Sequence, residues 1–150
     1  MSIKVVRTDT INKDLQILIT HLDEYIRGID GANHEFYPQF NTLENITGVV
    51  MVYDNEVPVG CGAFKEFDSD SIEVKRMFVE EAYRGKNIAL LIINEIEKWA
   101  KEIGYTYAVL ETGKNMFTAV NFYKKNGYFL IENYGPYVEA PNSVCFKKEL

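Results

Sequence analysis

The chain has 150 residues, of which 47% are hydrophobic, and this is enough for one domain with a core but too little for two. Its net charge of -6 disfavours nucleic-acid binding, because a protein that holds a nucleic-acid backbone usually carries a basic surface. No apolar run reaches the ~18 residues of a membrane span, and the N-terminal segment lacks the apolar stretch of a signal peptide, so we expect residues 1–150 to form one cytoplasmic domain.

The two cysteines predict buried, reduced thiols. Cys61 and Cys145 lie in apolar, strand-like segments, and neither has C-x-x-C or metal-type spacing. A free cysteine in such a segment behaves as a small apolar side chain. We therefore expect no disulfide, no nucleophilic cysteine and no metal site.

The N-terminal part of the chain predicts a strand over residues 3–8 and then a helix. Asn12 can cap this helix, because its side-chain oxygen can accept a hydrogen bond from a first-turn N–H group. Gly28 follows the last apolar residue and is expected to end the helix. The apolar residues between these two recur at helical spacing on one face: Leu15, Leu18, Ile19, Leu22, Tyr25 and Ile26.

The segment from Gly31 to Glu44 is expected to be irregular, since Pro38 forbids a helix through its middle. Its ring-bearing residues are His34, Phe36, Tyr37 and Phe40. A loop of this kind can form the wall of a substrate pocket, or it can simply cover a sheet edge. The sequence leaves both interpretations open.

Residues 46–67 predict two antiparallel strands joined by a turn at residues 54–56. The second of these strands contains Gly60 and Gly62, which indicate a β-bulge or a close approach of another part of the chain. A further turn at residues 68–70 leads into a third strand, which begins at Ser71.

The stretch from Ser71 to Ile103 predicts a strand, a basic turn and a long amphipathic helix. The turn spans residues 83–89, contains a glycine, and ends where the apolar helical period begins. The first N–H groups of a helix have no intrahelical partner and lie at the positive end of the helix dipole, so this turn suits a phosphate group. Gly104 should end the helix, whose apolar stripe is Ile88, Leu91, Ile92, Ile96, Trp99, Ala100 and Ile103.

The C-terminal part predicts a strand over residues 105–111, a helix over 116–126, and strands over 128–133 and 143–148. The first of these strands must run parallel to the strand before the long helix if that helix packs back on the sheet. The basic turn then lies at the edge where open α/β sheets bind ligands. A phosphate-bearing ligand at this edge is therefore predicted from the residues alone.

Two motifs in this region resemble those of the GNAT superfamily of acyl-CoA-dependent N-acetyltransferases. The superfamily's pyrophosphate motif, Arg/Gln-x-x-Gly-x-Gly/Ala, corresponds to residues 84–89, and Met77-Phe78-Val79 stands in the place of the usual Leu-x-Val. Its second signature, Asn-x-x-Ala-x-x-Leu-Tyr-x-x-x-Gly-Phe, corresponds to residues 116–128. The resemblance covers residues 57–150 and implies an α/β fold (α+β in some schemes): a GNAT-like mixed, mostly antiparallel twisted sheet, flanked by helices, with a central parallel strand pair splayed around the cofactor.

The chain departs from these motifs at two positions. Asn87 replaces a glycine, and asparagine is the non-glycine residue that best tolerates left-handed backbone angles, so the turn can still form. Met116 replaces the asparagine of the second signature, and Asn115 lies one residue earlier. We expect the polar contact near the cofactor to be either absent or supplied by Asn115.

The resemblance implies a way of binding acetyl-CoA as co-substrate. The main chain of Met77, Phe78 and Val79 would pair with the pantetheine arm like a missing strand, and its N–H groups would polarise the thioester carbonyl as an oxyanion hole does. The backbone N–H groups of the turn would hold the pyrophosphate. The turn residues concerned are Arg84, Gly85, Lys86, Asn87, Ile88 and Ala89.

The resemblance also implies direct attack of an amine on the thioester, in a ternary complex. An amine with a pKa of ~10.4 must lose a proton at neutral pH before it can attack, and a carboxylate is the usual base. Glu73 corresponds to the position of the base in some members, with Glu111 as a competitor and Glu66 as a third candidate. Tyr123 corresponds to the tyrosine that protonates the departing thiolate or hydrogen-bonds its sulfur.

The residues that bind the acetyl acceptor are the hardest part of the site to predict from the sequence. Lys75 and Arg76 can line its site, and a side chain that points in would favour a carboxylate on the substrate. Turns at residues 135–137 and 141–143 fall where members of the superfamily shape the acceptor pocket. We expect a small-molecule amine rather than a protein, with pairing into a homodimer left open. The alternative function is a catalytically weak acyl-CoA-binding sensor or regulatory module.

Overall fold

One mixed β-sheet organises the computed structural model, which describes residues 1–30 and 42–150. Within these residues seven strands follow the order β1-β2-β3-β4-β5-β7-β6. Every neighbouring pair is antiparallel except β4 with β5, which confirms the predicted mixed sheet with a central parallel pair. The strands are β1 (Ile3–Thr8), β2 (Ile46–Asp54), β3 (Val57–Glu66), β4 (Ser71–Val79), β5 (Tyr107–Gly113), β6 (Phe129–Ile131) and β7 (Ser143–Glu149).

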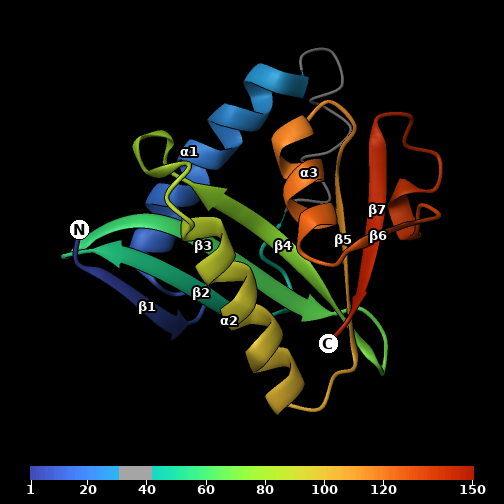
Figure 1. Ribbon diagram of the computed structural model, residues 1–150, viewed down its shortest axis with the longest axis horizontal. Coiled ribbons are helices and arrows are strands. Elements are labelled where there is room, and N and C mark those ends of the chain that lie inside the picture. The colour runs from blue at the N-terminus through green and yellow to red at the C-terminus, as the bar shows by residue number, and fades with distance from the viewer. Residues whose placement is uncertain (31–41) are drawn as a thin grey trace.

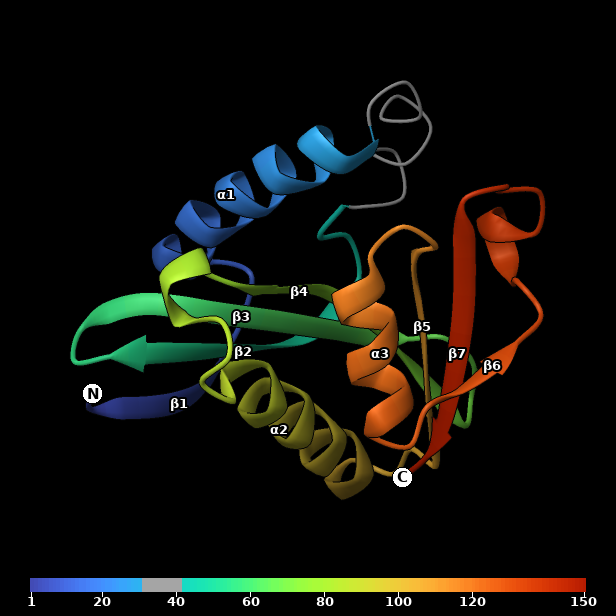
Figure 2. The same cartoon turned by 45° about the horizontal axis from the view of Figure 1, so that its top comes forward.

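Helices cover both faces of the sheet (Figures 1 and 2). Helix α1 (Lys13–Asp30) lies on one face, while α2 (Ile88–Glu102) and α3 (Phe117–Lys125) lie on the other. Each face has its own core. The α1 core contains Leu15, Leu18, Leu22, Val49, Met51, Cys61, Ala63 and Phe78, whereas the α2–α3 core includes Val50, Val52, Phe64, Ile92, Ile96, Leu110, Tyr123 and Phe146.

The helix caps follow the sequence signals only in part. Asn12 caps α1 as expected, because its Oδ1 accepts hydrogen bonds from the N–H groups of Asp14 (2.8 Å) and Leu15 (3.2 Å). The prediction that Gly28 ends α1 is wrong, since the helix continues to Asp30. A glycine inside a helix costs only about 1 kcal/mol, which the buried face of α1 offsets. Gly104 does follow α2, with φ of 105°.

The apolar stripe of α2 is shifted from the predicted one. Leu91 and Ile103 are 38% and 48% exposed, whereas Ile93, which the prediction left out, is completely buried. The buried arc is centred between Ile92 and Ile96, so Leu91 lies at its edge. Ile103 lies just beyond the last residue of the helix.

Of the two alternatives predicted for the glycines of β3, a bulge or a close backbone approach, the structure shows a bulge, together with close packing of α2 side chains. A Cβ atom at Gly60 would lie 2.9 Å from Ile88 Cγ2, and one at Gly62 would lie 2.6 Å from Ile92 Cγ2, so α2 approaches the strand closely. A β-bulge also lies at Gly62, because the pairing with β4 shifts between Cys61 and Ala63.

Several smaller expectations can be compared with the described residues. Strand β6 is shorter than predicted, at residues 129–131. Cys61 and Cys145 are buried free thiols, and burial raises the pKa of each, to about 12 and about 11. Within residues 1–30 and 42–150 no helix is long and apolar enough to cross a membrane. The ring-bearing residues predicted to form a loop, at 34, 36, 37 and 40, lie outside the described residues.

Candidate active site

The central parallel strands separate soon after they begin. β4 and β5 pair only at three positions, from Ser71 with Tyr107 to Glu73 with Val109, and then diverge (Figures 1 and 2). β5 stays paired with β7 as far as Gly113. Beyond Glu73, the edge of β4 that faces β5 therefore has no strand partner within the described part of the chain, which confirms the predicted splay.

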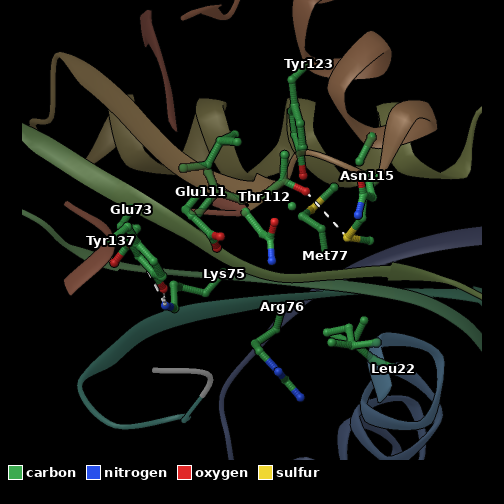
Figure 3. Close-up of a pocket in the computed structure, with 17 residues that line it drawn as sticks. Leu22, Glu73, Lys75, Arg76, Met77, Glu111, Thr112, Asn115, Tyr123 and Tyr137 are labelled. Atoms are coloured by element: carbon green, nitrogen blue, oxygen red, sulfur yellow. Dashed lines mark hydrogen bonds and ion pairs between the residues drawn. The ribbon is translucent and has the colours of Figure 1, made fainter. Parts of the chain in front are cut away.

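A cavity of about 150 Å³ lies at this split. Strands β4 and β5 form two of its walls, α3 a third, and α1 contributes Leu22 and Ile26. The connection between β6 and β7 adds Tyr137 and Asn142. The close-up in Figure 3 labels these predicted residues that line the cavity: Glu73, Lys75, Arg76, Met77, Glu111, Asn115 and Tyr123. Met116 lines it as well.

Two of the three candidate bases line the cavity, and each is held by a hydroxyl group. The Tyr134 hydroxyl donates to Glu73 Oε2 at 2.7 Å, and Ser143 Oγ donates to Glu111 Oε2 at 2.7 Å. Burial and the charge of Glu73 raise the pKa of Tyr134, so its hydroxyl stays protonated and able to donate. Glu66 is not at the cavity: it is exposed and accepts a hydrogen bond from the Tyr105 hydroxyl at 2.7 Å.

The two cations that follow Glu73 point in opposite directions, as consecutive strand residues do (Figure 3). Lys75 turns toward Glu73, with its Nζ 3.9 Å from Glu73 Oε2 and 3.4 Å from the Tyr137 hydroxyl. Burial lowers the pKa of Lys75. Arg76 turns toward α1 and pairs with Asp23. A substrate carboxylate beside Arg76 is therefore not supported.

Arg76 is unusual in two further respects. Its side chain is 2% exposed, and its Nε and Nη1 have no hydrogen-bond partner among the residues that the structure describes. Its φ is 57°, in the left-handed region that few residues other than glycine adopt. Arg76 and Met77 together face the single residue Gly62, so the extra residue of the β-bulge lies in β4 where β5 diverges.

Tyr123 brings a buried hydroxyl to the cavity from α3. Its ring packs edge-on against Phe122 and Tyr128, with centroids 5.3 Å and 5.5 Å away, and only 6% of the residue is exposed. Figure 3 shows its oxygen pointing into the cavity. Burial raises the pKa of Tyr123, so the group is protonated at neutral pH and can donate a hydrogen bond.

The basic turn before α2 has the backbone that a ligand-binding turn requires. Asn87 adopts φ 64° and ψ 18°, which confirms that it can replace the glycine of the motif. Its side chain does not cap α2, so the first-turn N–H groups of Ile88 and Ala89 are not covered from within the turn. Gly85 has φ of 77°, and among the described residues no heavy atom beyond its two chain neighbours lies within 4 Å of the position a Cβ would occupy.

Two predicted cofactor residues have side chains that make contacts within the protein. The Arg84 guanidinium stacks 4.6 Å from the Tyr25 ring centroid, and its Nε donates to the Val79 carbonyl at 3.1 Å. The Phe78 ring packs in the core beneath α1.

At the second signature, Asn115 and Met116 both line the cavity, and Met116 Sδ lies 3.7 Å from Thr112 Oγ1.

Sequence reasoning placed the turns at 135–137 and 141–143 near the acceptor but missed the hydroxyl groups around them. Tyr134 and Ser143 each contact a candidate base. Their position at the predicted pocket turns was the sequence signal that could have identified them. Asp23 gave no such signal, since it is one of several acids on α1. Among the described residues, no group of three or more His, Cys, Asp or Glu side chains could hold a metal ion.

The sheet splits at its central parallel pair, and a cavity lined by two glutamates and a tyrosine lies at the split. Solved structures of other proteins share this fold. The chain is similar to a proposed acyl-CoA N-acyltransferase from Klebsiella pneumoniae (TM-score 0.83, 22% identity, 99% of this chain and 97% of that chain). It is also similar to a GNAT family acetyltransferase from Elizabethkingia anophelis with acetyl-CoA bound (TM-score 0.73, 16% identity, 99% of both chains).

Sequence comparison identifies the family. A sequence model of the acetyltransferase (GNAT) family matches residues 16–128. The chain is also 30% identical over 152 residues to the IAA acetyltransferase of Azospirillum brasilense, with 99% of each protein covered. The chain belongs to the acetyltransferase (GNAT) family, and its activity is that of an N-acetyltransferase.

Proposed function

We propose that residues 1–150 act as one domain that transfers an acetyl group from acetyl-CoA to the amine of a small molecule, by direct attack in a ternary complex. The observation that carries this proposal is that Glu73, Glu111 and Tyr123, from three different elements, line one cavity at the β4–β5 split. The acetyl-CoA bound to the E. anophelis relative supports the donor. The compact cavity and the name of the A. brasilense relative support a small acceptor.

The residues present fit acetyl-CoA. The β4 edge at Met77, Phe78 and Val79 has no β5 partner, so its main-chain groups can pair with an extended amide-bearing arm. The turn at residues 84–89 offers main-chain N–H groups at the N-terminus of α2, beside the open space at Gly85, for a pyrophosphate. When bound, acetyl-CoA supplies the acetyl group as a thioester, whose carbonyl carbon is open to attack by an amine.

Glu73 is the base that we assign to the reaction. The incoming amine is protonated at neutral pH, and the Glu73 carboxylate takes its proton so that the nitrogen lone pair can attack the carbonyl carbon. Tyr134 and Lys75 both approach Oε2 of Glu73, which leaves Oε1 for the amine. Glu111 is the alternative base, since it lines the same cavity.

Two groups of the chain would stabilise the negative charge that develops. N–H groups of β4 after the bulge would donate to the carbonyl oxygen as it becomes an oxyanion. The Tyr123 hydroxyl would donate a hydrogen bond to the sulfur as the carbon–sulfur bond breaks, and the second proton that the nitrogen loses on forming the amide would go to the departing thiolate. An ordinary tyrosine is about 1.5 pKa units less acidic than a thiol, and burial raises the pKa of Tyr123 further, so we assign it a hydrogen bond to the sulfur rather than complete proton transfer.

A screen of acetyl-CoA consumption over an amine library, with mass spectrometry of the products, tests the proposal. The expected result is acetylation of one chemical group of small amines, with release of one thiol per acetylated product. A thermal shift with acetyl-CoA but no acetylation of any amine would refute the enzymatic proposal and favour the sensor alternative.

A further inference from the structure

The connection from β6 to β7, together with Ser143 at the start of β7, reaches three charged groups of the cavity. The Tyr134 hydroxyl donates a hydrogen bond to Glu73, and the Ser143 hydroxyl donates one to Glu111. Between them, the Tyr137 hydroxyl lies 3.4 Å from Lys75 Nζ. One short stretch of chain therefore contacts both candidate bases and the cation beside them.

This connection is braced by its own contacts. The side-chain amide of Asn133 donates to the carbonyl of Tyr137 at 3.0 Å and to the carbonyl of Ser143 at 3.1 Å, so it ties the start of the segment to its middle and its end. Tyr137 is 2% exposed and packs with Ala140 and Cys145 in a small core. The Tyr134 ring lies edge-on to Phe67 and Tyr137, with centroids 4.7 Å and 5.8 Å away. These contacts hold the Tyr134 hydroxyl in one place.

A fixed hydroxyl has two effects on a carboxylate. It restricts a glutamate side chain, which otherwise rotates about several bonds, to the orientation that accepts the hydrogen bond. It also replaces the water that the carboxylate loses on burial. Glu73 is 6% exposed, so a protein donor takes the place of water there. A base must be both ionised and correctly oriented to take a proton.

We propose that Tyr134 is the positioning residue of the base: its hydroxyl holds Glu73 by Oε2 and directs Oε1 toward the acceptor amine, while Asn133 keeps Tyr134 in place. This inference rests on the proposed function, with Glu73 as the base. Tyr134 does not touch the reacting atoms. Its effect on the reaction passes through Glu73 alone.

The pH dependence of kcat/KM for the amine, measured in wild type and Tyr134→Phe, tests the inference. Phenylalanine keeps the ring contacts with Phe67 and Tyr137 and removes only the donor. Because Tyr134 acts only through the base, its loss should change the pH profile, which a merely structural change would leave in place. We expect kcat to fall about tenfold and the KM for acetyl-CoA to stay the same. Asn133→Ala should give a smaller change in the profile.

Tyr105→Phe is the matched control. It removes a tyrosine–glutamate hydrogen bond of the same length, 2.7 Å, from Glu66 outside the cavity, and its pH profile should match that of wild type. A Tyr134→Phe profile that superimposes on wild type overturns the positioning role and leaves the proposed function intact. A shift in Ser143→Ala with none in Tyr134→Phe also overturns it, in favour of Glu111. A wild type that acetylates no amine refutes the proposed function itself.

Discussion

Replacing Tyr123 with phenylalanine should separate catalysis from stability. The substitution removes one oxygen atom and keeps the ring, which packs against Phe122 and Tyr128. Burial is the only cause of the raised pKa of Tyr123, and no described residue hydrogen-bonds its hydroxyl. The hydroxyl therefore contributes little to folding, and we expect its role to lie in the reaction.

The expected loss follows from the charge on the departing sulfur. A hydrogen bond to a charged group contributes about 1.5–3 kcal/mol, and about 1.4 kcal/mol corresponds to a tenfold change in rate. Tyr123→Phe should therefore lower kcat by roughly 10- to 100-fold. The KM for acetyl-CoA should change little, because the intact thioester carries no charge for the hydroxyl to stabilise. The melting temperature should stay the same or rise, since no internal hydrogen bond is lost.

Tyr128→Phe provides the matched control. Tyr128 is buried like Tyr123, with 3% of the residue exposed. Its hydroxyl, however, donates a hydrogen bond to Glu97 Oε2 at 2.9 Å, away from the cavity. We expect this variant to keep kcat and to melt about 3–6 °C lower, because it loses a buried hydrogen bond to a carboxylate. Thiol-release kinetics and thermal unfolding of both variants measure the two effects. A Tyr123→Phe enzyme within twofold of wild type, or an equal loss of kcat in both variants, would refute the role of Tyr123.

Three further predictions concern the base, the turn and the bulge. Glu73→Gln should flatten the rise of kcat with pH, as a missing base requires, and an unchanged profile would transfer the role to another group. Gly85→Leu should raise the KM for acetyl-CoA by placing a side chain where the pyrophosphate is expected, whereas Gly104→Leu, at φ of 105° after α2, should lose stability with normal KM. Asp23→Ala should lower the melting temperature by roughly 5–10 °C, because it leaves the buried guanidinium of Arg76 without its carboxylate, and a loss below 2 °C would show that the pair adds little.

The turn before α2 shows why part of this site could be predicted. A left-handed turn needs glycine or asparagine, so Gly85 and Asn87 at this spacing indicate the backbone conformation before any coordinates exist, and their φ of 77° and 64° confirm it. The parallel β4–β5 pair was predictable for a similar reason, since a helix that packs back on the sheet allows only that direction. Both inferences depend on residues close together in the chain.

The contacts that hold the bases were not predictable, because they join residues far apart in sequence. Tyr134 lies 61 positions from Glu73, and Ser143 lies 32 positions from Glu111. No periodicity links such pairs, and many other hydroxyl residues in the chain could equally have met a glutamate. The wrong end assigned to α1 has a different cause: Gly28 is a local stop signal, and the buried apolar face of the helix overrides it.

The bulge in β4 is held by α1, although α1 lies on the opposite face of the sheet from α2. Of the described non-glycine residues with positive φ, three are asparagines, which tolerate that region, and the fourth is Arg76. Such strain persists only where surrounding contacts enforce it. Here Asp23 of α1 holds the guanidinium, and Gly62 leaves room opposite the bulge for Ile92 and Met77. Because the bulge lies beside the point where β5 leaves β4, we expect Asp23→Ala to lower kcat as well as stability, with a smaller change in the KM for acetyl-CoA.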